Sequence, residues 1–316
     1  MRNTLGSVNL AVENLISPIA RIAEEARANL TFEQTTAIEN AFSLRTVNLK
    51  RMLAQVRTEL SQPENKILSN LNGIRARLEG LRNEYLKTEM AFGLYVDLLH
   101  TRAIEVGMGR ILRGYDRLAN ITLKKFLLPL GHEIPTVVVY LEQIGDGAAI
   151  LRADISLWDR MRNPCAVIKL PQATLNLPRS SILHEAGHQI GSITGLNREV
   201  SEIMYRAVRN AGGSHQLANY YRFCATEIVA DQVANQMTNW ISAITLYNIY
   251  SGGSGSSLGA AARMFAIIPR DTHLNGYLRI RCAIESAKFA LGTRGPWTDL
   301  EKALDILYPI SLAPER

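Results

Sequence analysis

The sequence of 316 residues has only three cysteines. Cys165, Cys224 and Cys282 are odd in number and widely spaced, which excludes a disulfide framework and a CxxC metal site. We therefore expect buried or free thiols in a reducing compartment.

Long hydrophobic runs are also missing. The most apolar stretch, residues 240–250, is about eleven residues long and contains three polar side chains, whereas a membrane-spanning helix needs about 20 apolar residues. Residues 1–28 contain three glutamates and lack the continuous apolar region of a secretory signal peptide. We expect no transmembrane segment, and a soluble protein that is cytoplasmic or exported by a route without a Sec signal peptide.

The positive charge is concentrated in the first part of the chain. Residues 1–130 contain 18 Lys and Arg against 13 Asp and Glu, a net +5 of the total +6. No cluster rich in both basic and aromatic residues accompanies this excess, so nucleic acid is not an expected partner.

The first 130 residues show helical patterns. Thr31 with Gln34, and Ser61 with Glu64, each have the spacing of a capping box and predict helices that begin near residues 32 and 63. A heptad-like seam of apolar residues follows in each helix, interrupted by Arg45 in the first. The short polar connection predicts an antiparallel, coiled-coil-like hairpin, preceded by a shorter helix over about residues 8–29.

Residues 129–131, Pro-Leu-Gly, end this pattern and mark a predicted boundary between domains 1–130 and 131–316. Three β-rich segments follow, at 136–141, 149–155 and 166–170. The fold class expected is α+β, predominantly α. A small sheet before a catalytic helix is typical of zincin-like domains, in which an edge strand binds an extended peptide.

The strongest motif is His184-Glu185-Ala186-Gly187-His188. Two histidines four residues apart lie on the same face of a helix and can bind one metal ion. The glutamate beside the first histidine is typical of the general base of a zinc protease.

A catalytic zinc normally takes a third protein ligand, and three glutamates follow: Glu199, Glu202 and Glu227. Thr194 stands where the metzincin pattern has its third histidine, which disfavours that class. Only Glu227 is followed four residues later by a carboxylate, Asp231, within a predicted helix over about 216–250. We predict Glu227 as the third ligand and Asp231 as the acceptor of a hydrogen bond from a ligating histidine.

HExxH followed by ExxxD resembles the gluzincin arrangement, and over residues 130–290 the chain is most similar to the HtpX-like and CAAX prenyl endopeptidases. That family has a histidine-proline motif with an arginine six residues after the histidine. Here His273 and Arg279 keep this spacing, and Leu274 replaces the proline. The resemblance implies that His273, supported by Arg279, stabilises the oxyanion. Tyr220, Tyr221 and His215 are the alternatives.

These patterns predict a zinc-dependent endopeptidase of the gluzincin type acting on a protein or peptide substrate. Zn²⁺ would be held by His184, His188 and Glu227, with Glu185 as general base. Residues 1–130 could serve as an adaptor, a self-association or docking element, an export address or an inhibitory prosegment. The alternative is a noncatalytic zinc-binding scaffold that acts through this helical module.

Overall fold

The computed structural model describes residues 6–7, 9–14, 30–103, 108–142, 147–171, 180–251, 264–265 and 275–312. Helices predominate and the strands form one small mixed sheet, which confirms the predicted α+β, mainly α class. Contacts group the chain into two compact units: unit 1 (1–116, 135–144 and 151–172) and unit 2 (117–134, 145–150 and 173–316).

Three helices form the long hairpin of unit 1: α2 (Phe32–Leu60), α3 (Glu64–Ser69) and α4 (Leu71–Ala103). The capping box of Thr31 and Gln34 is present at the start of α2. The second predicted capping box is wrong, because α3 follows Pro63 with no side-chain cap. The Ser61 hydroxyl instead donates to the carbonyl of Thr58 at 2.8 Å, so it belongs to the end of α2.

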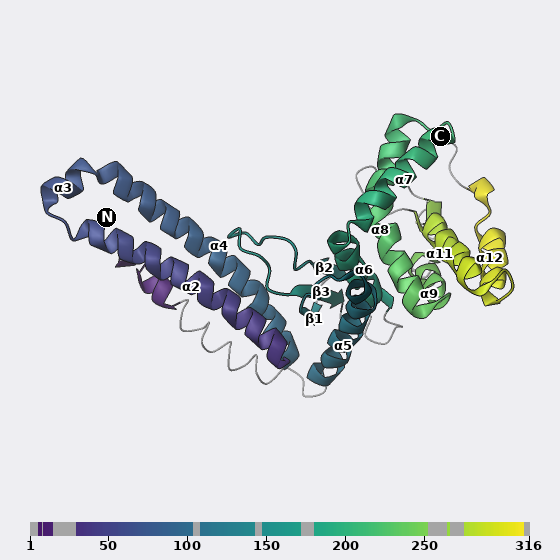
Figure 1. Ribbon diagram of the computed structural model, residues 1–316, viewed down its shortest axis with the longest axis horizontal. Helices are drawn as coiled ribbons and strands as arrows, with labels where there is room; N and C mark the ends of the chain where they lie inside the picture. The colour runs from purple at the N-terminus through teal and green to yellow at the C-terminus, as the bar shows by residue number, and fades with distance from the viewer. Residues whose placement is uncertain are drawn as a thin grey trace. The chain divides into compact units, whose positions relative to one another are not determined.

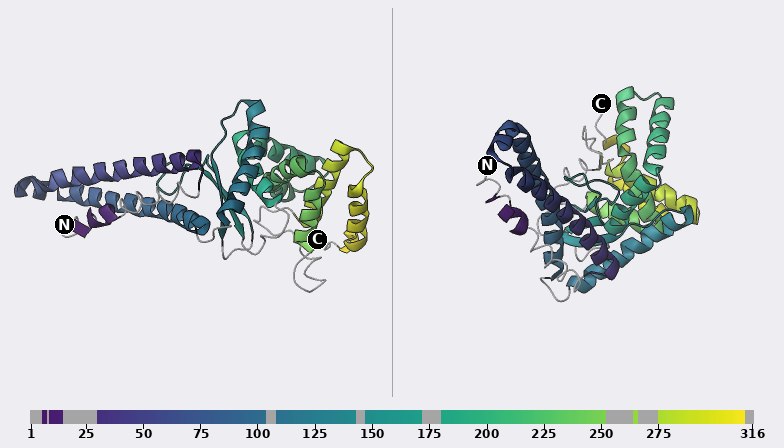
Figure 2. Two further views of the ribbon diagram at one scale, coloured as in Figure 1. Left: turned by 90° about the horizontal axis from the view of Figure 1, so that it is seen from below. Right: turned by 60° about the vertical axis from the view of Figure 1, so that its left-hand side comes forward.

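Helices α2 and α4 pack side by side in opposite directions (Figures 1 and 2). Phe42 contacts Phe92 with ring centroids 5.6 Å apart, while Glu59, further along α2, pairs with Arg77, earlier in α4. This order of contacts is that of an antiparallel hairpin. The predicted seam is buried on both helices; its fully buried members include Ile38, Phe42, Leu49, Val56, Ile74, Leu81 and Tyr95.

Arg45, which interrupts the seam in the sequence, is itself buried. Its guanidinium forms two hydrogen bonds with the carboxylate of Asp159 and lies 5.3 Å from the centre of the Phe42 ring. A buried charge is tolerated when it is paired in this way. Arg45 therefore joins α2, through a buried ion pair, to the segment that precedes the last strand.

The sheet contains β1 (Val137–Glu142), β2 (Ala149–Leu151) and β3 (Ala166–Pro171) in the order β1-β3-β2. Strands β1 and β3 are parallel, with Val139 opposite Ile168. The three predicted strand positions are confirmed, although β2 ends four residues earlier than expected.

The core of unit 1 joins this sheet to the hairpin. Val138 of β1 and Val167 of β3 belong to the same buried cluster as Phe42 and Tyr95. The contacts therefore group β1 and β3 with the first helices, because these two strands bury apolar side chains in the same cluster as α2 and α4. A separate domain of residues 1–130 stays a prediction.

Helix α5 (Met108–Leu127) begins in unit 1 and continues into unit 2. The later helices of unit 2 are α6 (Ser180–Ile193), α7 (Leu196–Asn210), α8 (His215–Thr238), α9 (Ile241–Ser251), α11 (Gly276–Leu291) and α12 (Pro296–Leu307). The single helix predicted over 216–250 is in fact α8 and α9. It breaks at Asn239, whose φ of 54° and ψ of −140° lie far from helical values.

Within the ranges given above, none of the helices has the length and apolar character required to cross a lipid bilayer.

Candidate metal centre

Helices α6 and α8 of unit 2 approach closely because a glycine lies at their contact. A Cβ atom on Gly187 would stand 2.7 Å from the Cα atom and 2.9 Å from the carbonyl oxygen of Ala230. Gly187 precedes His188, and Ala230 lies between Glu227 and Asp231. The close approach therefore brings the HExxH motif of α6 next to the ExxxD motif of α8.

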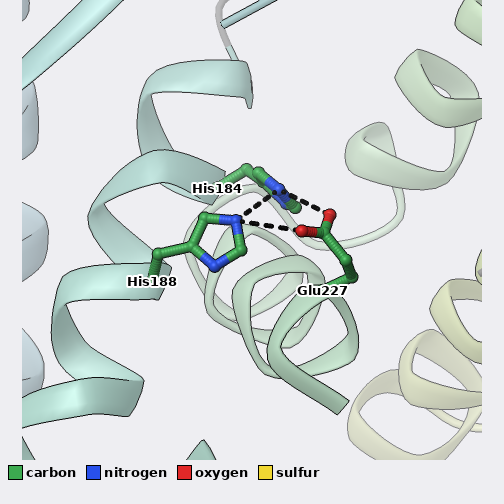
Figure 3. Close-up of side chains that lie close together, drawn as sticks. All are labelled: His184, His188 and Glu227. Carbon is green, nitrogen blue, oxygen red and sulfur yellow. Dashed lines mark hydrogen bonds and ion pairs between the residues drawn. The ribbon is translucent and has the colours of Figure 1, made fainter. Parts of the chain in front are cut away.

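The side chains of His184, His188 and Glu227 converge between these helices (Figure 3). The two histidine Nε2 atoms are 3.1 Å apart. Glu227 Oε2 lies 3.3 Å from His184 Nε2, and Glu227 Oε1 lies 3.4 Å from His188 Nε2. Two imidazole nitrogens and the two oxygens of one carboxylate thus lie around one point.

The spacing of these donor atoms fits a tetrahedral metal ion. Ligand bonds of about 2.0–2.1 Å at tetrahedral angles place neighbouring donor atoms about 3.3 Å apart. The two histidine side chains keep 15% and 17% of their surface exposed, whereas Glu227 keeps 6%. The group could hold a metal ion, with solvent reaching it from the histidine side.

Asp231 fixes the orientation of the His184 ring. Its Oδ1 atom lies 2.8 Å from His184 Nδ1. An ionised carboxylate only accepts hydrogen bonds, so Nδ1 keeps its hydrogen, and it is the proton on Nε2 that the ring gives up when that nitrogen binds a metal. The contact predicted from the ExxxD spacing is present.

Arg279 of α11 contacts the carboxylates of Asp231 and Glu227. It donates from Nε and Nη2 to both oxygens of Asp231, each at 2.7 Å. Its Nη1 atom donates to the hydroxyl of Tyr250 at 3.0 Å and lies 3.4 Å from Glu227 Oε2. The sequence did not predict these partners; here the guanidinium neutralises and positions buried acidic groups.

The ionisation of the four groups follows from this packing. Burial by itself raises the pKa of Glu227, but hydrogen bonding to His184 and the nearby cations lower it to about 2. Asp231 has a pKa of about 2, because Arg279 and His184 outweigh its burial. Both carboxylates are therefore ionised at neutral pH.

The histidines respond in opposite directions. Burial lowers the pKa of His184, but its hydrogen bonds with Asp231 and Glu227 outweigh this effect and raise that pKa to about 9. Burial and the positive charge of His184 lower the pKa of His188 to about 4. Two buried carboxylates beside one guanidinium thus attract a second positive charge, which a divalent cation can supply.

The other predicted residues have separate surroundings. Glu185 is buried in α6, next to His184. Glu202 pairs with Arg222 and Glu199 is exposed on α7, so neither belongs to the three-residue group. His273 lies outside the described residues.

The alternative oxyanion donors lie on α8. Tyr220 and Tyr221 are partly exposed, with ring centroids 5.6 Å apart. His215 is exposed, and its Nδ1 atom lies 2.5 Å from the hydroxyl oxygen of Tyr205.

Sequence reasoning missed two residues that shape the centre. In the sequence, Tyr250 is only the last residue of a predicted helix, yet its hydroxyl accepts a hydrogen bond from Arg279. Its ring also packs against Gly276, and a Cβ atom on this glycine would lie 2.4 Å from the ring. Gly187 lies inside the HExxH motif, and no role was predicted for it. A glycine between two helical metal ligands was the available signal, because glycine costs helix stability unless close packing requires it.

No family model, no curated protein and no solved structure matches this chain. The resemblance to the HtpX-like and CAAX prenyl endopeptidases therefore stays a prediction carried by the motif residues.

Proposed function

We propose that the chain is a zinc-dependent endopeptidase in which His184, His188 and Glu227 hold the metal. The observation that carries this proposal is the set of donor distances of 3.1, 3.3 and 3.4 Å among two imidazoles and one carboxylate. This ligand set, with a fourth position left to solvent, is typical of catalytic zinc, whereas structural zinc is usually enclosed by four protein ligands.

When bound, zinc would supply a Lewis acid that polarises the scissile carbonyl and acidifies the attacking water. Glu185 takes the proton of that water and delivers it to the leaving amine. Its place next to His184 in α6 supports this role. Retention of a carboxylate there also favours catalysis over a purely structural site, which needs no base.

Two neighbouring residues orient the proposed ligands and balance their charge. Asp231 keeps a hydrogen on Nδ1 of His184, so that Nε2 is the nitrogen that would exchange its proton for the metal. Arg279 holds Asp231 with two hydrogen bonds and balances the negative charge of Glu227. Stabilisation of the oxyanion by His273, or by Tyr220, Tyr221 or His215, remains part of the proposal.

The experiment compares wild type with Glu185→Gln, which preserves side-chain shape and removes the base. Zinc content is measured on both proteins, together with cleavage of an unfolded casein substrate. We expect unchanged zinc and a rate lower by at least about 100-fold. Glu199→Gln, on an exposed position of α7, is the matched control and should cleave normally.

Normal cleavage by Glu185→Gln would overturn the proposed mechanism. One zinc per chain in the wild type with no hydrolysis of any unfolded protein would instead favour the alternative, a noncatalytic zinc-binding scaffold acting through the α2/α4 hairpin.

A further inference from the structure

The exposed face of α5 is basic along its length. Arg110, Arg113, Arg117 and Lys124 are exposed and recur at steps of three, four and seven residues, which place them on one face of the helix. The first and last are 14 residues apart, or about 21 Å at 1.5 Å per residue. We call these four residues the α5 basic stripe.

The α5 basic stripe has no acidic counterpart on its own helix. The one acidic residue of α5, Asp116, is buried and receives two hydrogen bonds from Arg102, at 3.1 and 2.6 Å. Among the described residues, no carboxylate lies within ion-pairing distance of the four cations. Some other exposed basic residues are paired; Arg77, for example, pairs with Glu59. The charge of the stripe is therefore directed to solvent.

Aliphatic side chains lie among these cations. Ile121, between Arg117 and Lys124, is 48% exposed, and Leu128, one turn after Lys124, is 58% exposed. The opposite face of α5 is occupied, since Leu112 and Leu123 are buried in the protein. The outward surface thus combines basic side chains with aliphatic groups and has no aromatic side chain at the stripe positions.

We propose that the α5 basic stripe docks on the surface of an anionic phospholipid bilayer. Arg and Lys side chains are attracted by acidic head groups, and aliphatic side chains among them enter the interfacial layer. A single-stranded nucleic acid would favour aromatic platforms for its bases, and this face offers none. The inference depends on α5 and on Leu128, which follows it, and is independent of the metal centre.

The test measures co-sedimentation of the full chain with vesicles of phosphatidylcholine alone and of phosphatidylcholine mixed with phosphatidylglycerol. We expect binding to the anionic vesicles only, and its loss at high salt. Each basic residue near such a surface contributes about 5-fold to partitioning, so Arg113→Gln/Arg117→Gln should bind about 25-fold more weakly.

The matched control is Arg75→Gln/Arg82→Gln on α4, which removes the same charge from exposed positions flanking Glu79. It should bind like wild type, and circular dichroism verifies that both variants are folded. Equal loss in both double variants would reduce the effect to net charge and overturn the proposal. Equal binding to neutral vesicles, or tight binding of an oligonucleotide without vesicle binding, would overturn it as well.

Discussion

Arg279 of α11 and Asp231 of α8 are joined by two parallel hydrogen bonds, each 2.7 Å long. The same carboxylate accepts the Nδ1 hydrogen of His184 at 2.8 Å. Asp231 therefore connects a buried cation to a candidate metal ligand. Through this connection, α11 contributes to the centre although it supplies none of the three proposed ligands.

The proposed ligands are tested by three single variants. His184→Ala, His188→Ala and Glu227→Ala should each lose most of the bound zinc, because a site with two protein ligands binds zinc far more weakly than one with three. Metal content after gel filtration is the measurement. His215→Ala is the control, since His215 is exposed on the same unit and contacts Tyr205. Full zinc in Glu227→Ala would remove Glu227 from the site.

Arg279→Ala should lower the free energy of unfolding by about 3–5 kcal/mol, because it leaves two buried carboxylates, Asp231 and Glu227, with only His184 to balance their charge. Chemical denaturation of the metal-free proteins measures this without a contribution from zinc. Arg281→Ala, on the same helix, removes partly exposed ion pairs with Glu301 and Asp305 and should cost only about 1 kcal/mol or less. Similar losses in both variants would contradict the proposed role of Arg279.

Gly187→Ala should weaken zinc binding and destabilise the protein by about 1–3 kcal/mol, since the added methyl group meets the backbone of Ala230 and must push α6 from α8. Gly114→Ala is the control, because Gly114 lies at an exposed position of α5 with nothing near its Cβ. That change should raise stability by about 0.5–1 kcal/mol. Wild-type zinc affinity in Gly187→Ala would show that the helix contact does not set the donor spacing.

Zinc binding should release a proton and tighten with rising pH. His184 has a pKa raised from 6.5 to about 9 in the metal-free protein, so at pH 7.5 the metal must displace its proton. His188, with its pKa lowered to about 4, is already neutral. Apparent affinity should rise about 10-fold per pH unit from pH 6.5 towards 9. Competition with a fluorescent chelator measures this, and a constant affinity over that range would contradict it.

The sequence predicted which side chains of α6 and α8 form the candidate site because helical spacing is a local property. His184 and His188, like Glu227 and Asp231, are four residues apart, so each pair had to share a helix face. The strands and the hairpin seam were predictable for the same reason, as each follows a short repeat of apolar residues.

Contacts between distant segments that no motif spacing indicates were not predictable. The pattern identified Arg279 by its distance from His273, yet its actual partners lie on α8 and α9, which only the fold brings near. The sequence shows Arg45 only as an interruption of an apolar seam, and it does not indicate that the buried Asp159 is the partner of this arginine. The break at Asn239 was not predicted, because a single Asn with a non-helical backbone inside an otherwise helical sequence gives only a weak local signal.

X-ray absorption spectroscopy of the purified protein, combined with its zinc stoichiometry, tests the metal centre most directly. The proposed ligands predict one zinc per chain, surrounded only by nitrogen and oxygen at about 2.0–2.1 Å, with imidazole scattering. The same spectrum should change in Glu227→Ala. Absence of stoichiometric zinc, or sulfur scattering at about 2.3 Å from a cysteine ligand, would contradict the centre formed by His184, His188 and Glu227.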